Sequence, residues 1–175
     1  AAAGAGPETV VALALPRSAA SIAAILGVMA AGAAYVPVDP ALPAERADFL
    51  LQRSGAALVL TDGPDGTQIV DTGPGDPAAH PAGSAPVPDS AAYVIFTSGS
   101  TGEPKGVVGT QGALASYARD HRDRVLAPAQ ARLGRPLRVA HAWTLSFDAS
   151  WQPLAALLDG HEVHLFGERE MRDAG

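Results

Sequence analysis

The sequence predicts an α/β domain whose mostly parallel sheet is flanked by helices. Short apolar runs of strand character alternate with segments of helical periodicity, which is the pattern of βα units. The 175 residues are enough for one domain with its own core. One strand-like run also leads directly into a loop of glycine and hydroxylated residues, which draws attention to that loop as a candidate site.

Strands are predicted where short apolar runs end at a proline or a loop. Pro16 ends the first run, while Pro37 and Pro40 bracket the exit from the second. In chain order the expected strands are Thr9–Leu15, Ala33–Val38, Ala57–Thr61, Tyr93–Phe96, Val107–Val108, a strand within Arg135–Trp143, and Glu162–Phe166.

Helices are predicted where apolar residues recur at helical spacing between a start signal and a stop signal. Ser18 is a plausible N-cap for a helix over Ala19–Ala31, and Gly32 ends it. The other helices are expected over Ala44–Arg53, Gly112–Leu126 and Asp148–Leu158. The segment Asp62–Ser90 is rich in Gly, Pro and Asp and lacks periodicity, so residues 62–90 are predicted to form a surface loop.

Composition excludes several classes of function. The net charge is −6 with no basic patch, which argues against nucleic acid as a partner. The chain has no cysteine, which excludes disulfides and thiol catalysis and fits a reducing cytoplasm. The longest apolar stretch, Ile22–Val38, is interrupted by Gly27, Gly32 and Pro37 and is not expected to span a membrane.

The loop Thr97–Gly106 has the chemistry of a phosphate-binding loop. Its glycines allow close approach of the backbone, so that N–H groups can converge on oxygens. Four hydroxyl groups add donors that rotate to fit, and one lysine supplies a mobile positive charge. The candidate phosphate-binding residues are Thr97, Ser98, Gly99, Ser100, Thr101, Gly102 and Lys105.

Other classes of loop fit this segment less well. Gly/Ser/Thr clusters between regular elements are often plain linkers, but a linker needs neither a lysine nor an adjoining strand. A P-loop requires Lys followed by Ser or Thr, whereas Lys105 precedes Gly106. No G-x-G-x-x-G occurs, and Ser98 stands where a serine-hydrolase elbow needs its first glycine.

The segment Thr97–Gly106 resembles the signature loop of the adenylate-forming superfamily, which includes acyl-CoA synthetases, luciferases and adenylation domains of nonribosomal peptide synthetases. Ala31–Pro40 resembles an element that adenylation domains carry upstream of this loop, and the sequence of its residues Tyr35–Asp39 favours the peptide-synthetase branch. Asp39 and Arg46 are expected to fix the following turn and helix start rather than to take part in chemistry.

Leu145–Trp151 resembles the motif that places an aspartate against the substrate ammonium in amino-acid-activating domains, and by that match the residue is Asp148. A carboxylate pairs well with an α-ammonium. The local sequence alone equally allows Asp148 to cap the following helix. Trp151 could line a side-chain pocket or simply pack, because the commoner motif has one more residue before its tryptophan.

The remaining candidates carry less weight. His161 and His164 fall short of H-E-x-x-H, and residues three apart on a strand face opposite ways, which argues against zinc. His141 is expected to be a core histidine. The arginines at 119, 122 and 124 are expected to form a solvated helix end. Gln111 stands where many relatives have histidine, so no role is assigned to it.

The resemblance implies a reaction. A carboxylate attacks the α-phosphorus of Mg²⁺·ATP, giving an acyl-adenylate and pyrophosphate, and a pantetheine thiol of a carrier protein then takes the acyl group. The loop would hold the β- and γ-phosphates, Lys105 would act catalytically by neutralising charge on the departing pyrophosphate, and Asp148 would select an amino acid. ATP, Mg²⁺, an amino acid, a carrier protein and neighbouring synthetase domains are the implied cofactors and partners.

The resemblance also implies that residues 1–175 are part of the large N-terminal subdomain. The adenine-binding, ribose-binding and C-terminal lysine motifs of relatives do not appear by Gly175, and the C-terminal subdomain is absent. The chain by itself is therefore expected not to complete adenylation. Two alternatives stay open: a non-catalytic interaction half-domain, and a fragment of an acyl- or aryl-acid ligase, which Asp148 and Tyr35–Asp39 argue against.

Overall fold

The computed structural model describes residues 4–64, 66–71, 87–98, 103–167 and 170. Contacts divide the chain into two compact units, Ala1–Gly112 and Ala113–Gly175. The described part of each unit has its own sheet, of six strands in the first and two in the second. No helix among these residues is long and apolar enough to cross a bilayer.

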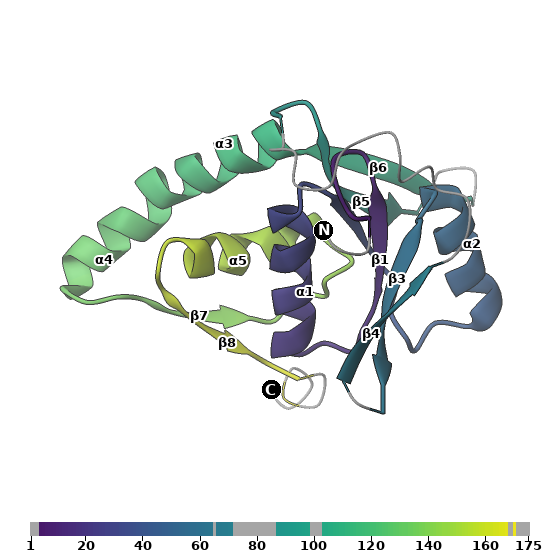
Figure 1. Ribbon diagram of the computed structural model, residues 1–175. Helices are drawn as coiled ribbons and strands as arrows, with labels where there is room; N and C mark the ends of the chain where they lie inside the picture. Colours follow the sequence, from purple (N-terminus) through teal and green to yellow (C-terminus); the bar gives the residue numbers. More distant parts are fainter. Residues whose placement is uncertain (1–3, 65, 72–86, 99–102, 168–169, 171–175) are drawn as a thin grey trace. The chain divides into compact units, whose positions relative to one another are not determined.

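The first unit is built on a sheet of order β4-β3-β1-β2-β5-β6, shown in Figure 1. Its four central strands are parallel: β3 (Leu58–Gly63), β1 (Val10–Ala14), β2 (Ala34–Pro37) and β5 (Ala91–Thr97). The edge strands β4 (Gly66–Asp71) and β6 (Lys105–Thr110) are antiparallel to their neighbours. The mostly parallel sheet that the sequence predicted is confirmed.

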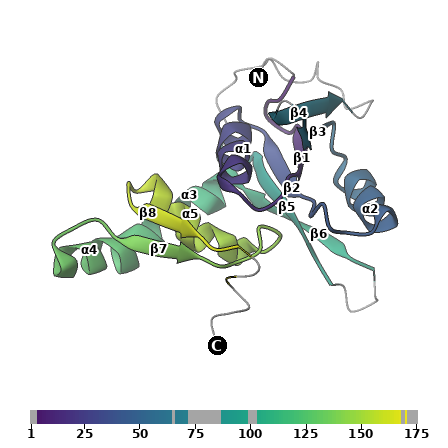
Figure 2. The ribbon, with the colours of Figure 1, turned by 90° about the horizontal axis from the view of Figure 1, so that it is seen from below.

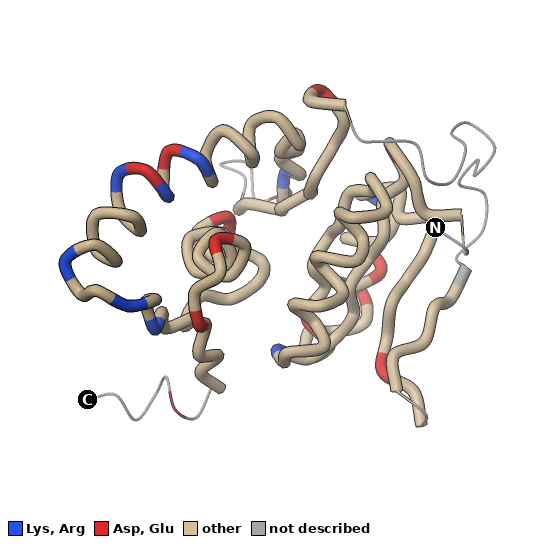
Figure 3. Tube along the Cα trace, turned by 60° about the vertical axis from the view of Figure 1, so that its left-hand side comes forward, with Lys and Arg blue, Asp and Glu red and all other residues tan. Residues whose placement is uncertain are grey.

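Helix α1 (Ala19–Ala30) begins and ends at the predicted signals. The backbone N–H of Ser21 donates to Ser18 Oγ at 3.2 Å, and that of Ser18 donates to Ser21 Oγ at 3.0 Å, which completes a capping box. Gly32, at φ +79°, follows the helix in the left-handed region. The helix carries no charged residue, as Figure 3 shows.

Helix α2 (Ala44–Ser54) also matches its prediction: Pro43 is its N-cap, and Gly55 at φ +65° is its left-handed C-cap. Leu50 on this helix is buried in a core cluster with strand residues. That cluster consists of Ala12, Val36, Val38, Leu50, Val59 and Val94. Asp39 Oδ1 accepts a hydrogen bond from the Ala41 N–H at 2.9 Å, so Asp39 does fix the turn between β2 and α2.

The second unit contains a long helical run and a helix–sheet pair. The run comprises α3 (Gln111–His121), whose first two residues belong to the first unit, the π-helical segment η1 (Arg122–Leu126) and α4 (Ala127–Leu133). It is followed by β7 (Arg138–His141), the 3-10 turn η2 (Asp148–Ser150), α5 (Trp151–Leu158) and β8 (Glu162–Leu165). Strands β7 and β8 pair in parallel.

The core of the second unit lies between this helical run, α5 and the strands. Leu126 of η1, Leu137 before β7 and Ala156 of α5 form a buried cluster, with Val139 and Val163 packed against it. Figures 1 and 2 both show α5 alongside the helical run, and α5 contacts η1. Helix α5, which follows the turn that begins at Asp148, is therefore held against η1.

Two sequence predictions need correction. Residues 62–90 were expected to form a loop, but this segment includes the end of β3 and the whole of β4; residues 72–86 lie outside the described set. Strand β4 exists because it pairs with β3 over its full length. The helix expected to end at Leu126 continues to Leu133, so Arg119, Arg122 and Arg124 lie within the helical run and not at its end.

Candidate functional site

The candidate phosphate loop connects β5 and β6 and leaves the carboxyl end of a parallel strand, which is where ligands bind in sheets of this kind. Thr97 is the last residue of β5 and is the cross-strand partner of Lys105, the first residue of β6. Thr97, Ser98 and Lys105 are exposed. The hydroxyl and the ammonium that close the two ends of the loop thus belong to directly opposed residues. Residues 99–102, with Gly99, Ser100, Thr101 and Gly102, lie outside the described residues.

Glycines in β6 let this hairpin pair closely with aromatic residues of β5. A Cβ on Gly109 would lie within 2.7 Å of Tyr93 Cε2 and closer still to other atoms of the same ring. A Cβ on Gly106 would meet Phe96 Cζ at 3.3 Å. The rings cover the places where side chains would otherwise stand, so the strand that follows the loop depends on glycine at position 109.

The start of α3 is fixed to the segment before β5 and is not an open anion site. The Gln111 N–H donates to Ser90 O, and the Gly112 N–H donates to Pro88 O, both at 2.8 Å. The side-chain Nε2 of Gln111 donates to Ala91 O at 3.3 Å. Gln111, to which the sequence assigned no role, therefore ties the end of β6 to the beginning of β5.

Asp148 stands at the first position of η2, after the extended residue Phe147, and is exposed. The N-cap of η2 is Phe147 and that of α5 is Ser150; neither makes a side-chain capping bond. No hydrogen bond from the Asp148 carboxylate to another described residue is present. Of the two readings left open by the sequence, helix capping thus lacks a capping bond, and the carboxylate is accessible to a ligand.

Other residues near Asp148 in sequence are buried. Trp151 is 2% exposed and His141, the last residue of β7, is fully buried, as expected for a core histidine. Trp151 packs in the interior, which was one of its two expected roles. Ser150 is buried as well, and its Oγ has no hydrogen-bond partner among the described residues.

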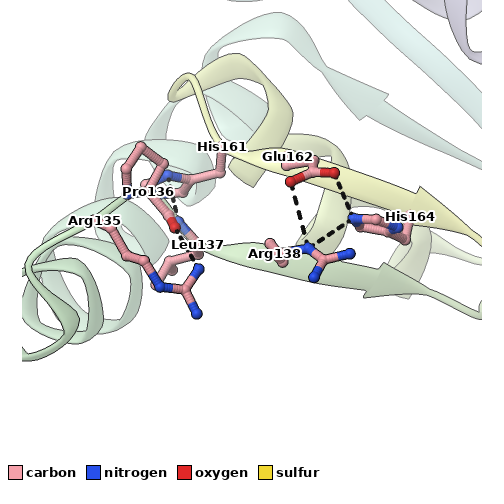
Figure 4. A network of polar contacts seen from close by, with 7 residues as sticks. All are labelled: Arg135, Pro136, Leu137, Arg138, His161, Glu162 and His164. Atoms are coloured by element: carbon pink, nitrogen blue, oxygen red, sulfur yellow. Dashed lines mark hydrogen bonds and ion pairs between the residues drawn. The ribbon is translucent and has the colours of Figure 1, made fainter.

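The two histidines of His161–His164 lie on opposite sides of their strand. His161 is buried, and its Nδ1 accepts the Leu137 N–H at 3.4 Å. His164 lies in the exposed network of Figure 4, where its Nε2 is 2.7 Å from Glu162 Oε1 and 3.2 Å from Arg138 Nε. Within the described ranges no three metal-ligating side chains gather.

The arginines of the helical run pair locally. Arg124 Nε lies 2.7 Å from Asp120 Oδ1, and Arg122 Nε lies 2.9 Å from Asp123 Oδ1. The alternating signs along this helix are visible in Figure 3. The hydrogen bond that Arg122 Nε donates to Asp123 Oδ1 raises the pKa of the Arg122 guanidinium above its ordinary value. The predicted solvated surface is confirmed, although it is not a helix end.

One residue in the electrostatic surroundings of Asp148, Tyr117, was not singled out from the sequence. Tyr117 on α3 stacks on His121 with ring centroids 5.7 Å apart and an interplanar angle of 12°. Burial raises the pKa of Tyr117, and the negative charge of Asp148 raises it further. The only sequence signal was the spacing of two aromatic residues four apart on a predicted helix.

The chain belongs to the AMP-binding enzyme family, whose pattern matches residues 1–175. It is 42% identical over 176 residues to the nonribosomal peptide synthetase CymA of Salinispora arenicola, covering 97% of this chain and 2% of that protein. It is 36% identical over 171 residues to bacitracin synthase 3 of Bacillus licheniformis, covering 93% of this chain and 3% of that protein.

Solved structures of nonribosomal peptide synthetases also match the fold of this chain. A crystal structure of the nonribosomal peptide synthetase FmoA3 with bound α-methyl-L-serine-AMP matches with a TM-score of 0.70 and 33% identity, over 94% of this chain and 19% of that chain. The four-domain synthetase AB3403, bound to AMP and glycine, matches with a TM-score of 0.70 and 29% identity, over 97% of this chain and 13% of that one. The chain therefore spans a small part of the relatives that it matches.

Proposed function

We propose that this chain is part of an amino-acid-activating adenylation domain of a nonribosomal peptide synthetase. The carrying observation is the β5–β6 hairpin, in which a Gly/Ser/Thr-rich segment closed by Lys105 leaves the carboxyl end of a parallel strand. The fully matched family pattern and relatives that bind aminoacyl-AMP or glycine support the choice of reaction.

In the proposed reaction, an oxygen of the amino-acid carboxylate attacks the α-phosphorus of ATP and forms a new O–P bond. The bond from that phosphorus to the bridging oxygen breaks, and pyrophosphate leaves with its electron pair. Amides and hydroxyls from Thr97 to Gly102 hold the β- and γ-phosphates. The Lys105 ammonium offsets negative charge that grows on the leaving group, which is electrostatic stabilisation without a covalent enzyme intermediate.

The Mg²⁺ that accompanies ATP would be bound chiefly by the phosphates. The Thr97 and Ser98 side chains offer hydroxyl oxygens, which are suitable but weak ligands for this cation. No group of three carboxylate or imidazole side chains lies together in the described part of the chain, so this segment is not proposed to hold Mg²⁺ without ATP.

Asp148 is proposed to bind the substrate ammonium. Its exposure and the lack of a capping bond leave the carboxylate accessible, and an ammonium gives it a charge-assisted hydrogen bond. In the last step a carrier-protein pantetheine thiol attacks the adenylate carbonyl, and AMP leaves. The carrier protein and the neighbouring synthetase domains are therefore the proposed partners.

Amino-acid-dependent exchange of pyrophosphate into ATP tests this proposal in the synthetase that carries these residues. Lys105→Ala should lower the exchange rate by a factor of about ten or more, because one preorganised positive group at a developing charge contributes about 2–4 kcal/mol. Arg53→Ala, which removes an exposed cation from the last turn of α2, is the matched control and should leave the rate unchanged. Equal rates for wild type and Lys105→Ala would contradict the assigned role.

The isolated chain is proposed to be inactive in the same assay, since the relatives it matches are many times longer. The alternative of an acyl- or aryl-acid ligase predicts exchange with carboxylic acids that lack an amino group. That outcome, together with full activity in Asp148→Ala, would favour the alternative. An interaction half-domain predicts no exchange with any acid, even in the intact protein.

A further inference from the structure

The first residue of β5 has both of its peptide groups held by side chains from other segments of the first unit. The Ala91 N–H donates to Glu8 Oε1 at 3.1 Å, and Glu8 comes shortly before β1. The Ala91 carbonyl accepts from Gln111 Nε2 at 3.3 Å, and Gln111 directly follows β6. Two side chains far apart in the sequence therefore converge on the amino end of β5, which is the end opposite the candidate phosphate loop.

Glu8 is held in a backbone conformation that glutamate rarely adopts. Its φ is +60°, and within the described part of the chain it is the one residue other than glycine with a positive φ. This conformation costs free energy in a residue with a Cβ, so it persists only where other contacts stabilise it. The hydrogen bond between its carboxylate and the Ala91 N–H is a contact of this kind.

At the same point β5 contains an extra residue relative to β6. Ala91 pairs with Thr110. Two residues later Tyr93 pairs with Gly109, so β5 has advanced two residues while β6 has advanced one. This is a β-bulge with Ala92 as its extra residue, and the shifted register is kept to the end of both strands. The two side-chain hydrogen bonds to Ala91 thus lie where the register of the β5–β6 hairpin changes.

The bulge decides which residue faces Thr97 at the mouth of the candidate phosphate loop. With the bulge, Thr97 lies opposite Lys105. Without it, the pairing that begins at Ala91 would continue unbroken and place Thr97 opposite Pro104, which has no N–H for the ladder. Because a slip of one residue turns the side chains of a strand to the other face, Thr97 and Lys105 would then project from opposite faces of the sheet.

We propose that Glu8 and Gln111 are positioning residues for the candidate phosphate loop, acting through the bulge at Ala92. This inference rests on the proposed function and deepens it, because it names the side chains that keep Lys105 opposite Thr97. Both side chains act at the far end of the hairpin, so they affect ATP through the register of the strands and not by contact with the phosphates.

The same register has a second source of support in the packing of Tyr93. Its ring occupies the space where a side chain at Gly109 would stand. A slip of one residue would bring Tyr93 opposite Val108 and its ring against a branched side chain. Loss of one hydrogen bond to Ala91 is therefore expected to raise the population of the slipped hairpin without unfolding it.

The first experiment measures pyrophosphate exchange in the intact synthetase against the concentrations of ATP and amino acid. Glu8→Ala and Gln111→Ala should each lower kcat/KM for ATP about three- to tenfold, as expected for one lost hydrogen bond, and leave the KM for the amino acid within about twofold of wild type. Glu8→Gln keeps an acceptor oxygen and should stay within about twofold of wild type for both substrates. Glu45→Ala, which removes an exposed carboxylate from the first turn of α2, is the control.

Glu8→Gly separates the hydrogen bond from the backbone strain. Glycine adopts a positive φ without strain but has no carboxylate. Glu8→Gly should therefore be more stable than Glu8→Ala in urea denaturation and yet equally slow in exchange with ATP. Wild-type exchange in Glu8→Gly, or equal losses for ATP and amino acid in Glu8→Ala, would show a merely structural role and overturn the inference.

A second experiment reads the register without activity. The 175-residue chain has no cysteine, so a pair of introduced cysteines reports on one pair of positions. Directly opposed residues of antiparallel strands are close enough for a disulfide. On oxidation, Thr97→Cys with Lys105→Cys should therefore cross-link faster than Thr97→Cys with Pro104→Cys. Adding Glu8→Ala or Gln111→Ala should reduce this preference about threefold or more, whereas Glu8→Gln should keep it.

An unchanged cross-linking preference in a folded Glu8→Ala chain overturns the inference, whatever the exchange assay shows. If Glu8→Ala does not fold, Glu8→Gly takes its place, since it lacks the same carboxylate and relieves the strain. A wild-type synthetase without exchange activity would contradict the proposed function, while the cross-linking preference would still decide whether Glu8 and Gln111 set the register.

Discussion

Gly109→Ala should destabilise the hairpin that carries the candidate phosphate loop, through one specific contact. Position 109 lies in β6, opposite Tyr93 of β5. The added methyl group would fall within 2.7 Å of Tyr93 Cε2 and closer to two other ring atoms, so the ring must move. Moving it disturbs its contact with Tyr35, whose ring centroid is 6.1 Å away and whose side chain is fully buried.

The expected size of the effect follows from two opposing contributions. Overpacking of this kind costs about 1–3 kcal/mol. Replacing glycine by alanine in a strand returns about 0.5–1 kcal/mol, since glycine loses more backbone freedom on folding. The net loss for Gly109→Ala should therefore lie between about 0 and 2.5 kcal/mol, with a central value of about 1 kcal/mol. At Gly106 the nearest ring atom would be 3.3 Å from the new methyl group, and Gly106→Ala should change stability by less than about 0.5 kcal/mol.

Urea denaturation of the chain, followed by circular dichroism, gives both values from the shift in midpoint at constant slope. A double-mutant cycle with Tyr93→Ala isolates the ring contact, because Gly109→Ala should no longer be destabilising once the ring is gone. If the penalty at position 109 is the same with and without the Tyr93 ring, or equals that at position 106, the steric reasoning is wrong.

Three further outcomes are expected. Ser18→Ala removes the hydrogen bond from the Ser21 N–H to Ser18 Oγ and keeps the one from the backbone N–H of residue 18 to Ser21 Oγ. It should cost about 1 kcal/mol in the same denaturation assay, and an unchanged midpoint would contradict it. Gly55→Ala places a Cβ at φ +65° and should cost about 1 kcal/mol although the space around it is open, so a stable variant would count against backbone strain. Asp148→Asn should lower the pKa of Tyr117, read from phenolate absorbance, because a negative neighbour is lost. The pKa of Tyr117 is higher in the folded than in the unfolded chain, so its contribution to stability is present below pH about 10 and is lost as pH rises through the folded pKa. An equal Tyr117 pKa in wild type and Asp148→Asn would refute this coupling.

Much of the fold could be predicted from local signals. Ser18 and Gly32 gave the ends of α1 to within one residue, because a capping hydroxyl and a left-handed glycine act locally. Strand β4 could not be predicted in the same way. Its residues gain their structure from pairing with β3, and several of them, including Ile69 and Val70, are largely exposed. Tertiary pairing decided this element, not its own periodicity.

The helical run was underestimated for a different reason. The predicted helix ended at Leu126, two residues before Pro128. Proline lacks the N–H that a continuing helix needs. The structure instead places π-helical residues just before it, and Pro128 falls in the first turn of α4, where it is tolerated. The change of pitch also allows Leu126 to be buried in the same cluster as Ala156.

In the candidate site too, some features follow from local sequence and others depend on tertiary neighbours. The hydroxyl-rich loop and Asp148 could be proposed from the sequence, because their chemistry depends on residue type. Tyr117 could not, because its partial burial and the nearby charge of Asp148 arise only in the folded chain. Whether a side chain meets a ligand is decided by tertiary neighbours that a single sequence does not display.

The pairing of Thr97 with Lys105 has a consequence for how such loops can change. The width of the loop mouth is determined by β-sheet pairing, and not by the residues between the two strands. Insertions or exchanges within the loop would therefore alter what it binds while the lysine stays opposite the threonine. In this hairpin the paired strand ends and the residues between them can diverge separately, which makes the loop a natural position for grafting other sequences.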